Sequence, residues 1–258
     1  MAGSDIALQV PVVDLDSPPP ALRESLAHAC EQWGIFYLVN HPMPPGLTSG
    51  ASEASRAFFE QPMAGKRALS RTLDNPWGYY DRELTKNLRD RKEIFDFGPG
   101  WTIPWPAHPS GFQATQEALS AACYSLGLRL MDLLDDALEL EQSFLRSAFE
   151  PQHSSFTRLN YYPVRDTLRD DHAPPPGPLG ISRHTDAGGL TVLLQDTVAG
   201  LQVYRDGWRD VTPLKGSLTI NIGDMMQVWS NDRFQAPLHR VSASKEQDRY
   251  SIAYFLNP

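Results

Sequence analysis

Residues 180–195 read GISRHTDAGGLTVLLQ, two apolar runs joined by a turn of small and polar residues. β-Branched residues and leucines dominate Leu190–Gln195, and together with the short run Gly180–Thr185 before it this is a pattern typical of two strands connected by a turn. Further short runs, separated by Gly, Pro, Asn or Asp, surround them: Phe156–Tyr162, Leu201–Tyr204, Leu218–Ile222, Met226–Trp229, His239–Ala243 and Arg249–Leu256. Short strands at this regular spacing predict a β-sandwich or barrel.

The part of the chain before residue 151 has a more helical pattern. Apolar residues recur at helical spacing in Ala21–Trp33, Leu47–Phe59, Gln113–Leu134 and Glu141–Phe149. Short strands are predicted at Val10–Leu15 and Ile35–Val39, and an exposed loop at Asp170–Leu179. We therefore expect one domain over residues 1–258, mainly β with N-terminal helices. Residues 1–150 would form a mostly helical part, and residues 151–258 the β core that carries the functional site.

The composition excludes several classes of protein. Against 23 Lys and Arg stand 31 Asp and Glu, a net charge of −8, which argues against broad electrostatic binding to nucleic acid or an anionic membrane. Two cysteines in 258 residues cannot form a disulfide framework, and no run approaches the roughly 20 apolar residues of a membrane helix. The first residues lack the pattern of a secretory signal. We expect a cytoplasmic protein with a small-molecule partner; the sequence does not indicate its oligomeric state.

A metal site is suggested by three residues of the β half. His184 and Asp186 are two positions apart, so on an extended segment both side chains leave the same face. His239 follows in PLHRV. Two imidazoles and one carboxylate are the set that holds non-haem Fe(II) while leaving coordination positions open. By itself the short pattern also fits histidines packed inside a barrel, so this alternative stays open on the motif alone.

An anion site is suggested by Arg249 and Ser251, again two positions apart, on the last predicted strand. An arginine inside a barrel is costly unless it meets an anion, and its guanidinium suits a carboxylate. The alternative is an exposed arginine on an edge strand, or one paired with a structural aspartate.

Taken together, the motifs resemble those of the isopenicillin N synthase-like Fe(II)/2-oxoglutarate-dependent dioxygenases, and the resemblance covers nearly the whole chain. The matching stretches are PVVDL (Pro11–Leu15), WGIFYLVNH (Trp33–His41), RKEIFDFG (Arg91–Gly98), RLNYYP (Arg158–Pro163), HTDAGGLTVLLQD (His184–Asp196), GLQVYRDGWRDV (Gly200–Val211), NIGDMMQVWSNDRFQAPLHRV (Asn221–Val241) and RYSIAYFLNP (Arg249–Pro258).

The resemblance implies a double-stranded β-helix (jelly-roll) core buttressed by N-terminal helices, and an oxidoreductase that uses an Fe(2+) ion with 2-oxoglutarate and O2 as co-substrates. It implies hydroxylation, desaturation or cyclisation of a small molecule, with release of succinate and CO2. The site residues it implies are His184, Asp186 and His239 for iron, and Arg249, Ser251, Tyr162 and Asn160 for 2-oxoglutarate. Substrate contacts are expected from Tyr79, Arg82, Phe97 and Arg183, although each arginine could instead be solvated or salt-bridged.

Three other functions fit part of this pattern. An oxidase of the same fold that uses iron and O2 without 2-oxoglutarate would leave Arg249 without an obvious role. A catalytically silent barrel that binds a small acid or a protein would not need three metal ligands, and a zinc hydrolase would not explain Arg249. Relatives generally continue past the Asn-Pro after the last strand, whereas this sequence ends at Pro258. We expect either a short form with a more open mouth or a tail absent from this sequence.

Overall fold

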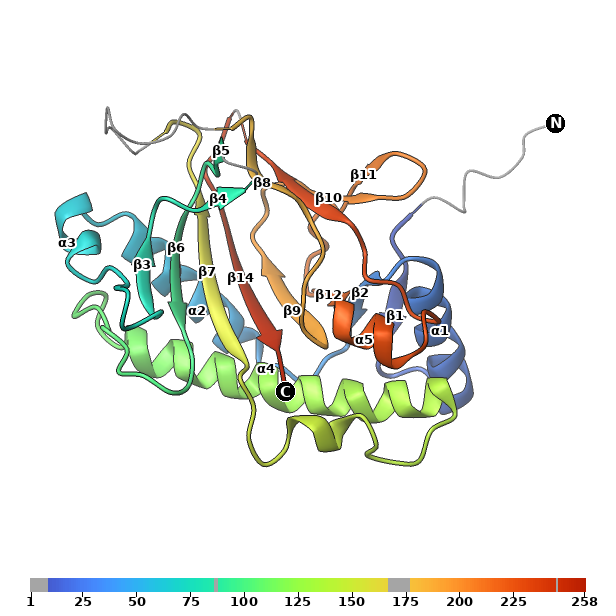
Figure 1. Ribbon diagram of the computed structural model, residues 1–258. Coiled ribbons are helices and arrows are strands. Elements are labelled where there is room, and N and C mark those ends of the chain that lie inside the picture. Colours follow the sequence, from blue (N-terminus) through green and yellow to red (C-terminus); the bar gives the residue numbers. More distant parts are fainter. Residues whose placement is uncertain (1–8, 86–87, 167–176, 245) are drawn as a thin grey trace.

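Two facing sheets form the centre of the protein in the computed structural model, which describes residues 9–85, 88–166, 177–244 and 246–258 (Figure 1). The larger sheet has the strand order β1 (Val12–Asp14), β2 (Ile35–Val39), β12 (Leu218–Ile222), β9 (Leu190–Gln195), β14 (Arg249–Leu256), β7 (Phe156–Tyr162), β6 (Glu93–Phe97) and β3 (Gly78–Tyr80). The smaller sheet has the order β11 (Trp208–Asp210), β10 (Leu201–Tyr204), β13 (His239–Ser242) and β8 (Leu179–His184). A two-stranded hairpin, β4 (Leu84–Thr85) with β5 (Leu88–Arg89), lies near the upper ends of β6 and β8 in the view of Figure 1.

Helices cover the outer face of the larger sheet. They are α1 (Pro19–Gln32), α2 (Pro45–Phe59), α3 (Met63–Arg67) and α4 (Phe112–Leu138). Two shorter helices are not part of this layer: the 3₁₀ helix η2 (Arg146–Phe149) follows α4 in the chain, and α5 (Asp224–Trp229) follows β12. Helix α4 runs along the sheet and contacts β14 (Figure 1). The contact is close at Gly127, where a Cβ atom would lie 3.1 Å from the side chain of Leu256. No helix among the described residues is long and apolar enough to cross a membrane.

Alternation along β14 separates two hydrophobic cores. Tyr250, Ile252, Tyr254 and Leu256 pack with the helices in the larger core. Ala253 and Phe255 belong to the smaller core between the sheets. Because successive side chains of a strand point to opposite faces, Arg249 and Ser251 share the face of Ala253 and point between the sheets. The fold thus sends a charged and a polar side chain into the space that the two sheets enclose.

Several sequence predictions are confirmed, among them the strands at Ile35–Val39, Leu218–Ile222 and Arg249–Leu256 and the helices near residues 21–33, 47–59 and 113–134. The mainly β composition is confirmed as well. The first part of the chain is less helical than expected, since β1, β2, β3 and β6 all join the larger sheet. The loop expected at Asp170–Leu179 lies mostly outside the described residues.

Two element predictions are wrong. Met226–Trp229 belongs to α5 and not to a strand, because its first amides bond the loop that follows β8: Asp224 N–H donates to Asp186 O at 2.7 Å and Met225 N–H to Gly188 O at 3.2 Å. Glu141–Phe149 forms only the 3₁₀ turn at its end. Ser143 has a φ of 64°, which interrupts a helix at that position.

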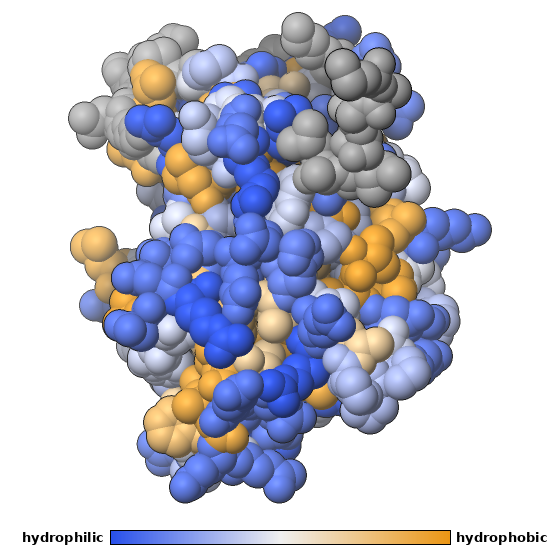
Figure 2. Space-filling view, turned by 90° about the vertical axis from the view of Figure 1, so that its right-hand side faces the viewer, coloured by the Kyte–Doolittle hydropathy of each residue, from blue (hydrophilic) through white to orange (hydrophobic). Residues whose placement is uncertain are grey.

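The surface is mixed. On the side shown in Figure 2 it is largely hydrophilic, with hydrophobic residues in separate patches. Isolated exposed apolar residues are ordinary on a folded protein.

Candidate active site

His184, Asp186 and His239 come together between the two sheets. His184, the last residue of β8, is the cross-strand partner of His239 on β13, and the two ring centroids are 4.3 Å apart. Asp186 Oδ1 lies 3.7 Å from His184 Nε2 and 3.6 Å from His239 Nε2. One potential ligand atom from each residue lies within 4.8 Å of the others, a spacing that fits one metal ion.

Backbone carbonyls fix the orientation of both imidazoles. His184 Nδ1 lies 2.9 Å from Ser182 O, and His239 Nδ1 lies 3.0 Å from Pro237 O. A carbonyl oxygen only accepts, so each Nδ1 carries the hydrogen and each Nε2 keeps its lone pair toward the centre of the cluster. Burial, together with the neighbouring His239 and Lys92, lowers the pKa of His184 to about 4. The neutral imidazole is the form that ligates a metal.

The carboxylate of Asp186 is held from the opposite side. Thr191 Oγ1 donates to Asp186 Oδ2 at 2.7 Å, and Asn221 Nδ2 donates to the same oxygen at 3.4 Å. Asp186 is 7% exposed. With Oδ2 engaged by these two donors, Oδ1 is the oxygen presented to the histidines, as expected for a metal ligand supported by its neighbours.

Arg249 is a buried cation with no carboxylate within ion-pair distance in the described part of the chain. It is 1% exposed, and its Nε donates to Val198 O at 3.2 Å and its Nη2 to Gln195 Oε1 at 3.0 Å. Its Nη1 is buried and has no hydrogen-bond partner among the described residues. A buried guanidinium with an open donor and no carboxylate in direct contact is costly, so the site favours an anionic ligand.

The residues predicted to accompany Arg249 lie beside it in the sheet. Tyr162 on β7 is its cross-strand partner, and the guanidinium carbon lies 5.0 Å from the centre of the Tyr162 ring. Ser251 pairs with Asn160 on β7 and with Gln195 on β9. Asn160 Oδ1 is buried and unpaired. The structure therefore brings all four residues of the predicted 2-oxoglutarate site onto one face of β7 and β14.

One cavity joins the metal cluster and the arginine. It has a volume of about 200 Å³, and its walls include His184, Asp186, His239, Arg249 and Ser251. Three buried polar atoms of its lining residues have no protein partner: Arg249 Nη1, Asn160 Oδ1 and Asn221 Oδ1. These residues fit an iron ion together with a small keto acid, because the histidine–carboxylate set supplies metal ligands and the unpaired guanidinium supplies the site for an anion.

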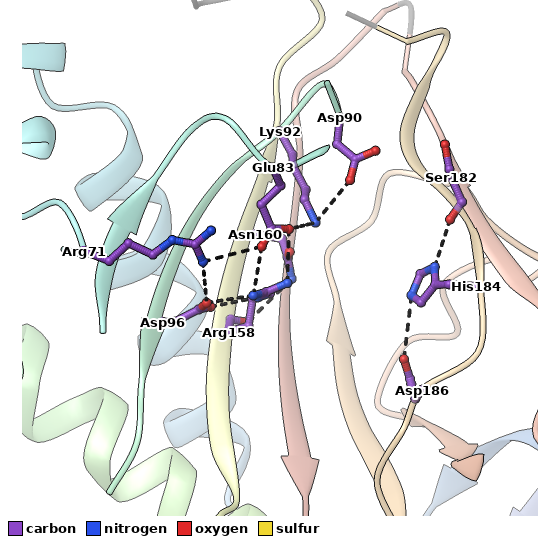
Figure 3. Close-up of polar contacts among 10 residues, drawn as sticks. All are labelled: Arg71, Glu83, Asp90, Lys92, Asp96, Arg158, Asn160, Ser182, His184 and Asp186. Carbon is purple, nitrogen blue, oxygen red and sulfur yellow. Dashed lines mark hydrogen bonds and ion pairs between the residues drawn. The ribbon is translucent and has the colours of Figure 1, made fainter. Parts of the chain in front are cut away.

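A cluster of charged residues on the β6 side of the same cavity was not singled out from the sequence. Figure 3 shows it facing His184 and Asp186. Its members are Arg71, Glu83, Asp90, Lys92, Asp96 and Arg158, of which Glu83, Asp90, Lys92 and Arg158 line the cavity. The signal available in the sequence was the density of charge in RDRKE (89–93), whose last three residues begin the matched stretch Arg91–Gly98.

The expected substrate residues lie elsewhere. Tyr79 and Phe97 are buried on the helix side of the larger sheet, where Tyr79 OH donates to Glu93 Oε2 at 2.9 Å and Phe97 packs on Trp105. Arg82 pairs with Asp81 at 3.6 Å, and its side chain is 45% exposed. Arg183 is exposed and alternates with His184 on β8. None of the four is among the residues described as lining the cavity.

Comparison with known families gives two matches that together span most of the chain. Residues 153–258 match the 2OG-Fe(II) oxygenase superfamily. Residues 10–127 match the N-terminal region of the non-haem dioxygenases in morphine synthesis.

Curated relatives are similar over nearly the whole chain. Flavone synthase of Petroselinum crispum is 32% identical over 277 residues, which cover 100% of this chain and 73% of that protein. Jasmonate-induced oxygenase 1 of Arabidopsis thaliana is 32% identical over 269 residues, 97% of this chain. The chain spans only 64% of the length of that second relative.

Solved structures of proteins crystallised with 2-oxoglutarate are also similar to this chain. JOX2, crystallised with 2OG, Fe and JA, has a TM-score of 0.85 and is 31% identical, covering 96% of this chain and 75% of its own. A full-length Neurospora crassa protein crystallised with alpha-KG has a TM-score of 0.84 at 28% identity, covering 99% of this chain and 87% of its own. A second structure of the Neurospora protein contains alpha-KG and thymine.

Proposed function

The chain belongs to the 2OG-Fe(II) oxygenase superfamily, and on that premise we propose how its own residues carry the reaction. His184 Nε2, Asp186 Oδ1 and His239 Nε2 hold the Fe(II) ion. Thr191 and Asn221 keep the Asp186 carboxylate in the orientation that presents Oδ1. The ion, when bound, couples activation of O2 to the oxidative decarboxylation of 2-oxoglutarate, and the protein is an Fe(II)/2-oxoglutarate-dependent oxygenase.

The co-substrate is anchored at the other polar group of the cavity, around Arg249. Arg249 pairs through its open Nη1 with the distal carboxylate of 2-oxoglutarate, and the Ser251 hydroxyl donates to the same group. Tyr162 and Asn160 complete this end of the pocket from β7. Burial makes these contacts strong and keeps water away from the reacting groups.

The framework for both sites is a double-stranded β-helix formed by the two sheets, with the whole chain as one oxygenase domain. Strands from the first part (β1, β2, β3 and β6) and from the second part (β7, β9, β12 and β14) share one sheet, which supports a single folding unit. Both cysteines are buried and unpaired, which fits the reducing conditions of the cytoplasm.

The reaction oxidises a small molecule by hydroxylation, desaturation or cyclisation and releases succinate and CO2. The observation that carries this function is the buried Arg249, which has an open Nη1 and no carboxylate within ion-pair distance among the described residues, in the cavity of the His184–Asp186–His239 cluster. An oxidase that did not use 2-oxoglutarate would need another anion, such as a carboxylate of its own substrate, to pair with that guanidinium.

The test is an anaerobic optical titration of the metal-free protein with Fe(II) and then with 2-oxoglutarate. A weak visible charge-transfer band that needs both additions is expected, since a keto acid must then chelate iron held by the protein. Iron binding without that band would favour the oxidase, and absence of iron binding would overturn the metal site.

Arg249→Gln sharpens this test. The variant should keep its iron content and lose roughly tenfold to hundredfold in 2-oxoglutarate affinity, because a charge-assisted contact is removed. Arg240→Gln is the matched control: Arg240 lies on β13, donates to Gln202 Oε1 at 2.8 Å and does not line the cavity. Equal affinities in the two variants would remove Arg249 from the 2-oxoglutarate site.

A further inference from the structure

The wall of the cavity that faces the iron ligands contains buried charge. The segment from β5 to β6 crosses the open side between the sheets: Arg91 N–H donates to Leu179 O of β8 at 3.3 Å, and Arg91 Nη2 donates to Val164 O, just after β7, at 2.7 Å. Arg91 thus bonds to the backbone of β8 and of the residues after β7, whereas Asp90 and Lys92 on either side of it line the cavity. This alternation brings the Lys92 ammonium to the space above the metal site (Figure 3).

Arg158 is held by protein acceptors through all three of its nitrogens. Its Nε and Nη2 donate to the two oxygens of Asp96 at 2.8 and 2.7 Å, and its Nη1 donates to Glu83 Oε2 at 3.2 Å. Such a two-pronged contact is rigid and leaves little capacity for another ligand. Arg158 therefore serves to hold the two carboxylates in place.

Lys92 differs because its hydrogen-bonding capacity is not used up. Its side chain is 3% exposed; Nζ lies 2.6 Å from Glu83 Oε2 and 3.8 Å from Asp90 Oδ2. An ammonium group has three N–H donors, and among the described residues only Glu83 offers Lys92 an acceptor at hydrogen-bond distance. Burying a cation with open donors is costly, so a ligand acceptor in the cavity would complete this site.

Lys66, a second buried lysine, has a purely structural environment and serves as a comparison for Lys92. Lys66 is 4% exposed, and its Nζ bonds Glu93 Oε2 at 2.5 Å and Phe59 O at 2.8 Å, with the rings of Tyr79 and Tyr161 within 6 Å of it. Lys66 is surrounded by protein acceptors and aromatic rings and does not line the cavity. Lys92 has fewer protein contacts and lies at the cavity wall.

The charge on Glu83 keeps the Lys92 ammonium in position. Burial alone would raise the pKa of Glu83, but Lys92 and Arg158 outweigh it and lower this pKa to about 2. Glu83 is therefore an anion throughout the neutral range and fixes one of the Lys92 donors. Because the contact with Glu83 holds the ammonium at the cavity wall, the remaining N–H donors of Lys92 are available to a ligand in the cavity.

From these contacts we propose that Lys92 is a substrate-binding residue that donates hydrogen bonds to a carbonyl or carboxylate oxygen of a small polar substrate. The inference rests on the proposed function, because the substrate must lie beside the iron. The size of the cavity supports it: about 200 Å³ is less than the roughly 300–1,000 Å³ of pockets for drug-sized ligands, and 2-oxoglutarate occupies part of it. An extended aromatic substrate would instead have to bury its rings against Glu83, Asp90 and Arg158.

The experiment measures substrate binding without turnover. The Fe(II) and 2-oxoglutarate form of the full chain is titrated under anaerobic conditions with two sets of compounds, and the shift of the visible band gives each dissociation constant. One set contains small polar carbonyl and carboxylate compounds, beginning with thymine and pyroglutamate. The other contains flavanones, beginning with naringenin. We expect compounds of the polar set to bind and flavanones to leave the band unchanged.

The compound that binds most tightly is then titrated into variants. Lys92→Met removes the charge and the donors, and Lys92→Gln keeps a neutral donor toward Glu83 in case Lys92→Met does not fold. Both should weaken the compound roughly tenfold to hundredfold and leave the band formed with 2-oxoglutarate intact. Lys215→Met is the matched control: Lys215 is exposed and outside the cavity, so this variant should change neither the affinity for the compound nor the band formed with 2-oxoglutarate.

Each other outcome has a definite meaning. Binding of flavanones alone, binding of no compound from the polar set, or unchanged affinity in both Lys92 variants would overturn the role of Lys92. Absence of the band in the unmodified protein would instead refute the proposed function, and the inference with it.

Discussion

His184 and His239 lie directly opposite each other on the antiparallel strands β8 and β13, and Asp186 Oδ1 is 3.7 and 3.6 Å from their Nε2 atoms. Neither histidine has a free choice of tautomer, since a carbonyl two residues earlier in the chain engages each Nδ1. The ligand set is therefore oriented by the strands themselves. Pre-organised ligands of this kind reduce the reorganisation that metal binding requires.

The first prediction concerns the ligands. His184→Ala and Asp186→Ala should each abolish iron-dependent turnover, because a site with two protein ligands holds Fe(II) poorly. The measurement is bound iron after gel filtration, together with succinate release. His153→Ala is the control, since His153 stacks on Tyr124 at 4.3 Å, away from the cavity. Retained activity in the His184 or Asp186 variant would defeat the metal assignment.

The second prediction concerns the hydroxyl behind Asp186. Thr191→Val keeps the shape of the side chain and removes the donor 2.7 Å from Asp186 Oδ2, so the affinity for Fe(II) should fall roughly tenfold. Thr157→Val is the matched control, because the buried Thr157 hydroxyl has no partner among the described residues and does not line the cavity. Competitive titration with a chelator measures the Fe(II) affinity of both variants. The same affinity in the two variants would show that Thr191 does not support the ligand.

The third prediction concerns the packing of Tyr162. A Cβ atom at Gly180 would lie 2.7 Å from Tyr162 Cδ1, so Gly180→Ala must displace the ring that contacts Arg249. We expect a loss of about 1–3 kcal/mol in unfolding free energy and a weaker affinity for 2-oxoglutarate. Urea unfolding and the optical titration measure the two effects.

Gly50→Ala is the control for that substitution. Gly50 lies within α2, and a Cβ atom there meets only Thr115 Cγ2, at 3.9 Å. The change should stabilise the protein by about 0.5–1 kcal/mol and leave 2-oxoglutarate binding unaltered. Unchanged 2-oxoglutarate affinity in Gly180→Ala would mean that the position of Tyr162 does not matter for the co-substrate.

The fourth prediction concerns acid stability. The pKa of Glu83 is lowered from 4.5 to about 2 in the folded protein, so its ionised form stabilises the fold above pH 4.5, and this contribution is lost as the pH falls from 4.5 toward 2. The contribution is of the order of 3 kcal/mol. Glu83→Gln should therefore be destabilised most at pH 7, and its difference from the unmodified protein should shrink below pH 4.5.

Urea unfolding at pH 7, 5, 4 and 3 tests this behaviour. Glu53→Gln, on the exposed side of α2, should alter the unfolding free energy by less than about 0.5 kcal/mol at each pH. A difference between Glu83→Gln and the unmodified protein that stayed constant with pH would contradict the ionic role of Glu83.

Local pattern predicted much of the site. The two-residue spacing of His184 and Asp186 and of Arg249 and Ser251 places each pair on one face of an extended segment, and the structure brings both pairs to one cavity. Spacing of this kind is a property of a few neighbouring residues, so it can be recognised in the sequence before the fold is known.

The sequence did not resolve which face of β6 points inward, because all five residues of Glu93–Phe97 are buried and no polar alternation distinguishes the faces. The register with β7 decides it: Ile94 and Asp96 pair with Asn160 and Arg158 on the cavity side, so Phe97 and its helix-side neighbour Tyr79 point away. The helix at Met226–Trp229 could not be predicted from the local sequence either, because it depends on hydrogen bonds to the distant loop that contains Asp186.

The sequence by itself indicated the residues that we propose as metal and anion ligands, and it predicted most strands and helices, since these depend on residue chemistry and short-range periodicity. Only the tertiary structure decided that Lys92 and Glu83 stand opposite His184. Those side chains reach the iron cavity because the segment between β3 and β6 crosses the gap between two sheets, a placement set by contacts among strands far apart in the chain.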